Sequence, residues 1–205
     1  MSYDFRPWPK IPRLSKMNCS ITEKLDGTNA IISIVRAELL SQEDRWQATA
    51  IFKEVAVFAG SRTRWIQPLN DNFGFAQWVF INAEKLVELL GEGTHYGEWW
   101  GQGVQRQYGL TKKYFTLFNP WRYGKGLNPE IPTASEQIRQ DKLLGCVPIL
   151  SEHQFSLSVI DEAVFKIAES SAAVPGWSKA EGVVVHIDGS NYKVVINGDE
   201  NKRVG

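Results

Sequence analysis

The chain of 205 residues has the length of one domain, or of one domain with a small appendage, and can bury a core without metal or disulfide support. Its 23 basic residues equal its 23 acidic residues, so its overall charge gives no sign of nucleic-acid binding. Two distant cysteines, no visible signal peptide and no apolar run of membrane-spanning length predict a cytoplasmic protein with free thiols and no membrane contact.

Two stretches nevertheless concentrate basic charge. The first sixteen residues carry four basic residues against Asp4 alone, and residues 112–125 contain four basic residues and no acidic residue. The second stretch is interleaved with aromatic residues, a composition that suits contact with a phosphate backbone. Solvated loop charge is an equally good interpretation of either stretch by itself.

The first half of the chain predicts strands followed by one long helix. Three prolines by residue 12 argue against a helix at the start. A β-like run ends at Lys24, residues 30–35 form a second apolar strand, and the β-branched and aromatic content of residues 48–58 favours a third. Apolar residues at helical spacing predict a helix from Asn72 to Leu90, before Gly91 and Gly93.

The second half predicts short strands and two helices. The helices run from Thr133, which begins a capping box, to Leu144, and from Ser158 or Asp161 to Ser170. The expected strands cover residues 95–99, 114–118, 147–150, 181–187 and 191–196. The last two strands flank an Asp-Gly-Ser hairpin turn. The predicted fold class is α+β, with antiparallel sheets flanked by helices in a single domain over residues 1–205.

The most informative segment is Glu23-Lys24-Leu25-Asp26-Gly27, which continues into Thr28-Asn29. Lys24 ends a strand before a tight turn, so its side chain projects from the end of a sheet, and Gly27 lets the backbone approach a ligand closely. The flanking polar groups can hold a metal or a nucleotide, which suits a lysine used as a nucleophile. An ordinary Asp-Gly surface turn is the structural alternative.

Four further segments carry groups that suit nucleotide chemistry. Arg62 follows a glycine-terminated strand, where a guanidinium can bind a phosphate or a carboxylate. Glu98 lies in an otherwise apolar strand, and burial of its carboxylate is costly without partners. An aromatic residue at the end of strand 114–118 could stack on a base. Glu181 and Lys193 bring opposite charges to one sheet surface, where a simple cross-strand ion pair is the alternative.

Taken in order, these segments resemble the covalent nucleotidyltransferase superfamily of ATP-dependent DNA ligases, RNA ligases and mRNA capping enzymes. The chain is most similar to the nick-sealing, phage-type RNA ligase branch, over about residues 19–202. Beside the lysine motif, the resemblance is carried by Ser61-Arg62, Gly97-Glu98-Trp99-Trp100-Gly101, Leu117-Phe118-Asn119, Glu181-Gly182-Val183-Val184 and Tyr192-Lys193. It implies the nucleotidyltransferase core of ligases, which is similar to the ATP-grasp fold.

The resemblance further implies an ATP-dependent RNA ligase that forms a lysyl-AMP intermediate, passes AMP to a 5′-phosphate end and joins that end to a 3′-hydroxyl. Because a lysine is protonated at neutral pH, a nearby cation or desolvation must favour its neutral amine. The implied roles are catalysis by Lys24 and Lys193, nucleotide binding by Glu23, Lys24, Asn29, Arg62, Glu98, Phe118 and Lys193, and binding of Mg²⁺, or Mn²⁺ in its place, by Glu181 and Asp26. Phe115 is the alternative to Phe118 for stacking on adenine.

Two departures from the family pattern bear on function. Val195 stands where many members carry a second basic residue, for which Lys202 is a candidate substitute. The chain also stops soon after the last motif, so we expect no oligonucleotide-binding domain and no C-terminal RNA-binding domain. The expected partners are ATP and RNA, as ends or as a nicked duplex, with substrate held by basic loops or by a partner protein. A DNA ligase, a capping-type nucleotidyltransferase and a non-catalytic nucleotide- or RNA-binding module are the alternatives.

Overall fold

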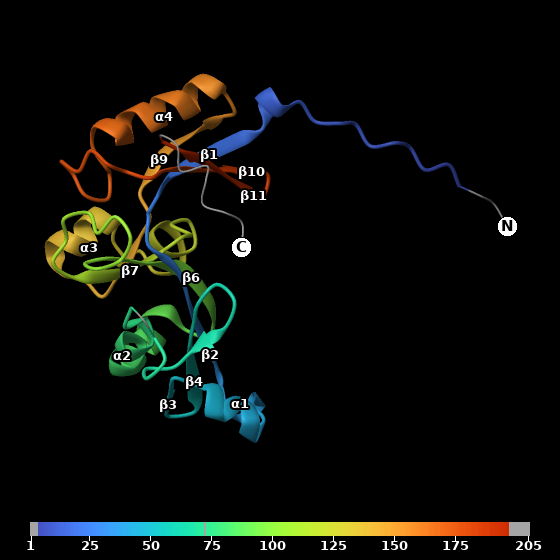
Figure 1. Ribbon diagram of the computed structural model, residues 1–205. Helices are drawn as coiled ribbons and strands as arrows, with labels where there is room; N and C mark the ends of the chain where they lie inside the picture. The colour runs from blue at the N-terminus through green and yellow to red at the C-terminus, as the bar shows by residue number, and fades with distance from the viewer. Residues whose placement is uncertain (1–3, 72, 197–205) are drawn as a thin grey trace.

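Two β-sheets, each packed against its own helix, form the molecule (Figure 1). The structure is a computed structural model that describes residues 4–71 and 73–196. The smaller sheet contains β1 (Asn18–Lys24), β9 (Ile149–Gln154), β10 (Gly182–Ile187) and β11 (Ser190–Val195) in the order β11-β10-β1-β9. The larger sheet contains β2 (Thr28–Arg36), β3 (Ala50–Phe52), β4 (Val55–Gly60), β5 (Trp65–Ile66), β6 (Gly93–Gly101), β7 (Lys113–Leu117) and β8 (Leu144–Cys146).

The larger sheet has the order β3-β4-β2-β6-β7-β8, and β5 pairs with β4. Its β7 and β8 are parallel, whereas its other strand pairs are antiparallel. The helices are α1 (Gln42–Gln47), α2 (Phe75–Leu90), α3 (Ala134–Gln140) and α4 (Leu157–Glu169). This arrangement confirms the predicted α+β class with antiparallel sheets. Within the described residues, no helix is both long enough and apolar enough to cross a membrane.

The smaller sheet buries one face against α4. Ile21 of β1 and Val183 of β10 are fully buried and pack with Ile160 and Ile167 of the helix. Because successive side chains of a strand point to opposite faces, Thr22 and Val184 lie on the other face, which lines a cleft. The apolar periodicity of these strands therefore leaves one face of the sheet for polar groups.

The larger sheet packs against α2. Phe115 of β7 and Trp99 of β6 are buried against Phe75, with ring centroids 5.3 and 5.4 Å from it. The Trp99 indole N–H donates to the Phe73 carbonyl at 3.0 Å, which satisfies its polar atom. Gly91 follows the last turn of α2 and adopts a left-handed φ of 68°, which ends the helix as predicted.

A third buried cluster joins the two layers. Leu25 of the segment after β1 packs there with Trp100 of β6, Tyr108 and Val147. The Trp100 indole N–H donates to the Thr116 hydroxyl at 2.8 Å, and that hydroxyl donates to the Gln137 side chain of α3 at 2.8 Å. These buried polar groups make hydrogen bonds to one another, and the bonds hold α3 in one position against β6 and β7.

The chain crosses between the sheets at two neighbouring points. β1 and β2 belong to different sheets, so Asp26-Gly27 is a crossover and not the hairpin turn that the structural alternative required. The second crossover, at residues 147–148, joins β8 to β9. The Glu23 N–H donates to the Pro148 carbonyl at 3.1 Å, so the two crossovers lie side by side.

Three predicted elements differ from those in the structure. Residues 48–58 form the hairpin of β3 and β4 and not one strand, because Lys53 adopts a left-handed φ of 53°. The helix predicted to reach Leu144 ends at Gln140, since Asp141 adopts a φ of 52°. The strand predicted at residues 147–150 begins only at Ile149, after the crossover.

Candidate active site

A cleft of about 650 Å³ is lined by residues of both sheets. β1, β10 and β11 contribute one wall, and β2 and β6 contribute to the other. The cleft brings together every site residue predicted from the sequence within the described ranges: Glu23, Lys24, Asp26, Asn29, Arg62, Glu98, Phe118, Glu181 and Lys193. Residues separated by up to 170 positions in the chain therefore surround one space.

Lys24 and Glu181 form an ion pair in this cleft. The Lys24 Nζ lies 2.6 Å from the Glu181 Oε2, and the two side chains are 27% and 7% exposed. Strand register explains the contact, because Lys24 is paired with Gly182 across β1 and β10. The amine is thus held at the end of a strand, on a buried carboxylate, with an open side toward the cleft.

Glu98 is buried on β6 beside the crossover. Its Oε1 accepts the Gly27 N–H at 2.9 Å, and its backbone is paired with Asn29 of β2. Burial raises the pKa of Glu98 to about 8, although the nearby Lys24 ammonium opposes this shift. The carboxyl group is therefore largely protonated at neutral pH, so it can donate a hydrogen bond as well as accept one.

Asp26 is fixed by a loop that the sequence did not single out. Its Oδ2 accepts from the Arg106 Nε at 2.8 Å, and its backbone N–H donates to the Tyr108 hydroxyl at 2.9 Å. Arg106 also donates to the Lys179 carbonyl at 3.3 Å. This loop has no helical or strand periodicity, and these contacts span 73 or more positions, so the sequence held no signal for them.

Glu23 anchors the segment that follows α4. Its two carboxylate oxygens accept from the Ser171 hydroxyl at 2.6 Å and from the Ala173 N–H at 2.8 Å. The side chain is buried, which raises the pKa of Glu23, although these hydrogen bonds oppose the shift. Glu23 lines the cleft, but both of its oxygens are engaged by the protein itself.

Of the two candidate adenine-stacking residues, Phe118 lines the cleft and Phe115 does not. Phe115 is fully buried and packs against Phe75 and Trp78 in the core of the larger sheet. Phe118 follows β7 and is half-buried. The alternation of the strand separates the two rings, since residues three apart lie on opposite faces.

A polar row crosses the wall of the smaller sheet. The Thr22 hydroxyl and the His186 Nε2 are 3.0 Å apart, and the His186 Nδ1 and the Asn191 Oδ1 are 2.7 Å apart. Sequence reasoning missed these three residues. Their signal was the two-residue period of β10 and β11, which puts His186 and Asn191 on the face that carries the exposed Lys193.

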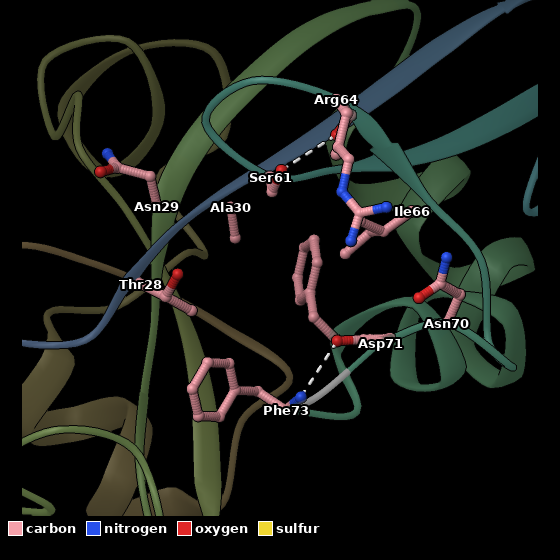
Figure 2. A pocket seen from close by; sticks show the side chains of 11 residues that line it. Thr28, Asn29, Ala30, Ser61, Arg64, Ile66, Asn70, Asp71 and Phe73 are labelled. Atoms are coloured by element: carbon pink, nitrogen blue, oxygen red, sulfur yellow. Dashed lines mark hydrogen bonds between the residues drawn. The ribbon is translucent and has the colours of Figure 1, made fainter. Parts of the chain in front are cut away.

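A smaller hollow of about 160 Å³ adjoins the cleft (Figure 2). Figure 2 shows Thr28 and Asn29 leaving β2 on opposite sides, with Arg64, Asn70 and Asp71 across the hollow. The Asp71 carboxylate accepts from the Phe73 N–H at 3.1 Å and from the Ala76 N–H, so it caps α2. Asn29 lines both spaces.

The acidic groups of the cleft fit a sparse metal site. Within the described ranges, no group of three or more His, Cys, Asp or Glu side chains is placed to hold a metal ion. Mg²⁺ needs only one or two carboxylates when substrate phosphates and water complete its shell. Val195 is paired with Gly182, and Lys202, its suggested substitute, lies outside the described residues.

The fold resembles solved structures of the RNA ligase of Naegleria gruberi. A mutant with ATP and Mn has 17% identity and a TM-score of 0.53, and the match covers 90% of this chain and 51% of that chain. A mutant with AMP and Mn has 19% identity and a TM-score of 0.51, over 90% and 51% of the two chains. A structure with PPi has 18% identity and a TM-score of 0.50, over 89% and 50%.

This chain therefore spans about half the length of the solved structures that it matches. A search of curated proteins finds no match. A family model described as RNA ligase matches residues 18–201, which is nearly the whole chain. That match agrees with the fold and with the motifs gathered in the cleft, and the chain belongs to the RNA ligase family.

Proposed function

We propose that this chain is an ATP-dependent RNA ligase whose Lys24 becomes covalently bound to AMP. The observation that carries the proposal is the Lys24–Glu181 pair, 2.6 Å long, in a cleft that also contains Glu98, Arg62 and Lys193. A positioned amine beside a carboxylate and two cations suits covalent transfer from a polyphosphate. The ATP, AMP and PPi named with the similar solved structures support this choice of nucleotide.

In the first step, the neutral amine of Lys24 forms a bond to the α-phosphorus of ATP. The bond from that phosphorus to the oxygen of the β-phosphate breaks, pyrophosphate leaves, and the nitrogen, now positively charged, releases one proton. In the second step, an oxygen of a 5′-phosphate end attacks the same phosphorus, the phosphorus–nitrogen bond breaks, and the lysine takes up a proton and leaves as an amine. In the third, a 3′-hydroxyl attacks the 5′-phosphorus, loses its proton and expels AMP. Each step is an in-line displacement, so the protein mainly positions groups and neutralises charge.

The remaining side chains of the cleft then have separate tasks. Glu98 would bind a ribose hydroxyl, and the ring of Phe118 would stack on adenine. Arg62 would bind phosphate oxygens, and the Lys193 ammonium would meet the α-phosphate, where negative charge develops during the displacement. Asn29 would contact the nucleotide from β2. Glu23 would act near the nucleotide mainly by holding residues 171–173, since its oxygens are engaged there.

Glu181 would be the principal ligand of Mg²⁺ or Mn²⁺, because its carboxylate faces the cleft beside the amine. Asp26 would become a second ligand of the cation only if its ion pair with Arg106 were broken. A bound divalent cation would neutralise phosphate charge and disfavour protonation of the neighbouring lysine. The similar solved structures with Mn support a divalent cation in this role.

The proposed substrates are ATP and RNA, as ends or as a nicked duplex, and the proposed unit is a single adenylyltransferase domain. Family membership supports RNA over DNA. A partner protein that contributes RNA binding is also part of the proposal. Two buried free cysteines support a reducing, cytoplasmic setting.

Replacement of Lys24 tests the proposal. Lys24→Arg keeps a cation beside the buried Glu181 but removes the nucleophile, so we expect transfer of AMP from α-labelled ATP to the protein to fall at least about a thousandfold. Lys85→Arg, an exposed lysine outside the cleft, is the matched control and should label normally. Circular dichroism of each variant checks the fold. Normal labelling of a folded Lys24→Arg protein would contradict the proposal.

Chasing the labelled protein separates the rival activities. We expect nicked RNA duplex to remove the label and yield sealed product, whereas nicked DNA duplex removes it more slowly. Labelling by GTP in place of ATP would identify a capping-type enzyme, and faster chase by nicked DNA would identify a DNA ligase. A protein that binds ATP and RNA but never takes label would be a non-catalytic binding module.

A further inference from the structure

Residues 4–16, here named the N-terminal arm, lie outside both sheets. Figure 1 shows the arm running away from the body of the molecule before β1 begins. Every residue of the arm is exposed, and residues 4–13 form neither helix nor strand. Phe5 and Trp8 are each 86% exposed and Ile11 is 78% exposed. Three large apolar side chains exposed within one short segment form a continuous apolar surface, and such surfaces mark binding sites.

Proline sets the conformation of the arm. Pro7, Pro9 and Pro12 fix their own φ near −65°, and each restricts the residue before it to extended backbone. Arg13, which precedes a single helical turn, has φ −83° and ψ 126°. These values are close to the polyproline II helix, which has three residues per turn and no internal hydrogen bonds.

A period of three residues divides the arm into two functional stripes. Phe5, Trp8 and Ile11 recur at this period and lie on one side of a polyproline II helix, about 19 Å from first to last. Lys10 and Arg13 recur at the same period on a second side, and Lys16 follows on the helical turn of residues 14–16. The arm therefore presents a row of aromatic and aliphatic groups beside a set of cations.

We propose that the N-terminal arm binds single-stranded RNA that flanks the break, with its cations on phosphates and its aromatic rings stacked on bases. The proposal rests on the RNA ligase activity proposed above and adds a second contact surface to it. Exposed rings beside cations are the combination that binds single-stranded nucleic acid with little sequence preference. The rigid backbone lowers the entropy lost on binding.

Charge favours RNA over a protein partner. The arm has four basic residues and one acidic residue, a net charge of +3, whereas the whole chain has a net charge of zero. The rest of the chain is therefore net acidic. Within the whole chain, basic charge is concentrated in the arm and in residues 112–125. In that second segment Lys112 and Lys125 are paired with Asp141 and Glu152, so part of its charge is already neutralised.

Geometry places the contact beside the break and not at it. The arm is continuous with β1, whose last residue is Lys24. The six residue steps of this strand hold the end of the arm at least about 20 Å from Lys24, given 3.3 Å per residue. At roughly 3 Å per stacked nucleotide, this distance equals about six or seven nucleotides. RNA that extends less than about six nucleotides from the break should therefore fail to reach the arm.

Two arm variants test the proposal in the full chain. Trp8→Ala removes one ring, and the triple change Lys10→Gln, Arg13→Gln, Lys16→Gln removes the set of cations. We measure binding of labelled RNA whose single-stranded flank extends 4 to 20 nucleotides from the break, by fluorescence anisotropy at several salt concentrations. We expect about tenfold weaker binding of long RNA by Trp8→Ala. The triple variant should lower the slope of log affinity against log salt by about two.

Short RNA and AMP uptake provide the internal controls. Both arm variants should bind RNA with four-nucleotide flanks as the wild type does and should take AMP from ATP at the wild-type level, because the arm lies outside the cleft. The matched charge control is Lys53→Gln, Lys85→Gln, Lys166→Gln, which removes three exposed lysines from other faces. This control should keep the wild-type salt slope on long RNA.

The outcomes separate the two proposals. Wild-type affinity and salt slope of both arm variants on long RNA would overturn the arm proposal and favour a protein that reads polyproline II segments. Equal loss in the charge control would overturn it too, since it would show an effect of net charge alone. A wild-type protein that takes no AMP but binds long RNA through the arm would refute the ligase proposal and leave the arm contact standing.

Discussion

Glu98 is buried, and its carboxyl group can accept the same hydrogen bond whether it is protonated or ionised. The residue is 7% exposed, and its carboxyl group accepts the Gly27 N–H. Burial raises its pKa from 4.5 to about 8, so the folded protein keeps a proton that the unfolded chain releases above pH 4.5. The stabilising contribution of this proton is complete below pH 4.5 and is lost as the pH rises through about 8.

The variant Glu98→Gln should therefore become more stable relative to the wild type as the pH rises. The amide keeps the acceptor oxygen but does not titrate, so the difference in unfolding free energy should grow from about pH 4.5 to about pH 8 and then level off. Its slope can reach about 1.4 kcal/mol per pH unit. Urea unfolding at six pH values measures it, and two parallel curves would contradict the expected titration.

Sequence reasoning found the charged residues of the cleft better than it found their partners. Lys24, Glu98 and Glu181 were predicted because a charged residue at the end of a strand or within an apolar strand is conspicuous. Arg106 and Ser171 were missed, since each acts through a contact with a residue more than 75 positions away. Local patterns carry no information about such contacts.

Gly27 is the residue that lets the first crossover pass close to β6. A Cβ added there would meet the Trp99 carbonyl oxygen and would lie 2.7 Å from the Trp100 Cβ. Both are parts of a buried strand that cannot move aside without disturbing the larger sheet. The absence of a side chain at this point therefore sets how closely the lysine segment approaches Glu98.

We expect Gly27→Ala to lower the free energy of unfolding by about 1–3 kcal/mol and to weaken ATP binding. Gly60→Ala is the matched control at the end of β4, beside the smaller hollow, where the nearest atoms belong to the partly exposed ring of Trp65. That ring can shift, so the control should cost less. Thermal unfolding and ATP titration measure both effects, and equal losses in the two variants would contradict the argument.

The elements that were predicted correctly are those with strong periodicity or a strong end signal. The helix α2 and the final hairpin have both, and Asp188 and Gly189 adopt the left-handed φ values of 48° and 76° that a two-residue turn needs. The pair β3 and β4 was predicted as one strand, since Lys53 is an uncommon residue in the left-handed region. Propensity alone could not locate that turn.

The two sheets of the molecule differ in whether their strands come from one continuous stretch of the chain. The larger sheet is built from one continuous stretch, residues 28–146, whereas the smaller sheet takes β1 from the beginning and its other strands from residues 149–195. Each sheet has its own buried cluster and its own covering helix. We therefore expect the two sheets to open as separate cooperative units.

The variant Val183→Ala tests this division, because Val183 is fully buried between β10 and α4. Loss of two methyl groups should destabilise the smaller sheet by about 2 kcal/mol. Amide hydrogen exchange in β1, β9, β10 and β11 should become about thirtyfold faster, while exchange in β6 and β7 changes little. Uniform acceleration in both sheets would show instead a single cooperative unit.

The position of β1 in the middle of the smaller sheet has a consequence for biosynthesis. Both neighbours of this strand, β9 and β10, are translated only after residue 148, so the ribosome delivers β1 long before anything can pair with it. At cellular elongation rates this interval is on the order of ten seconds. Its apolar residues Cys19 and Ile21 must stay shielded by chaperones or by transient contacts during that time. An unfinished nascent chain, although it already contains the reactive lysine, has no nucleotide pocket until its last strands emerge.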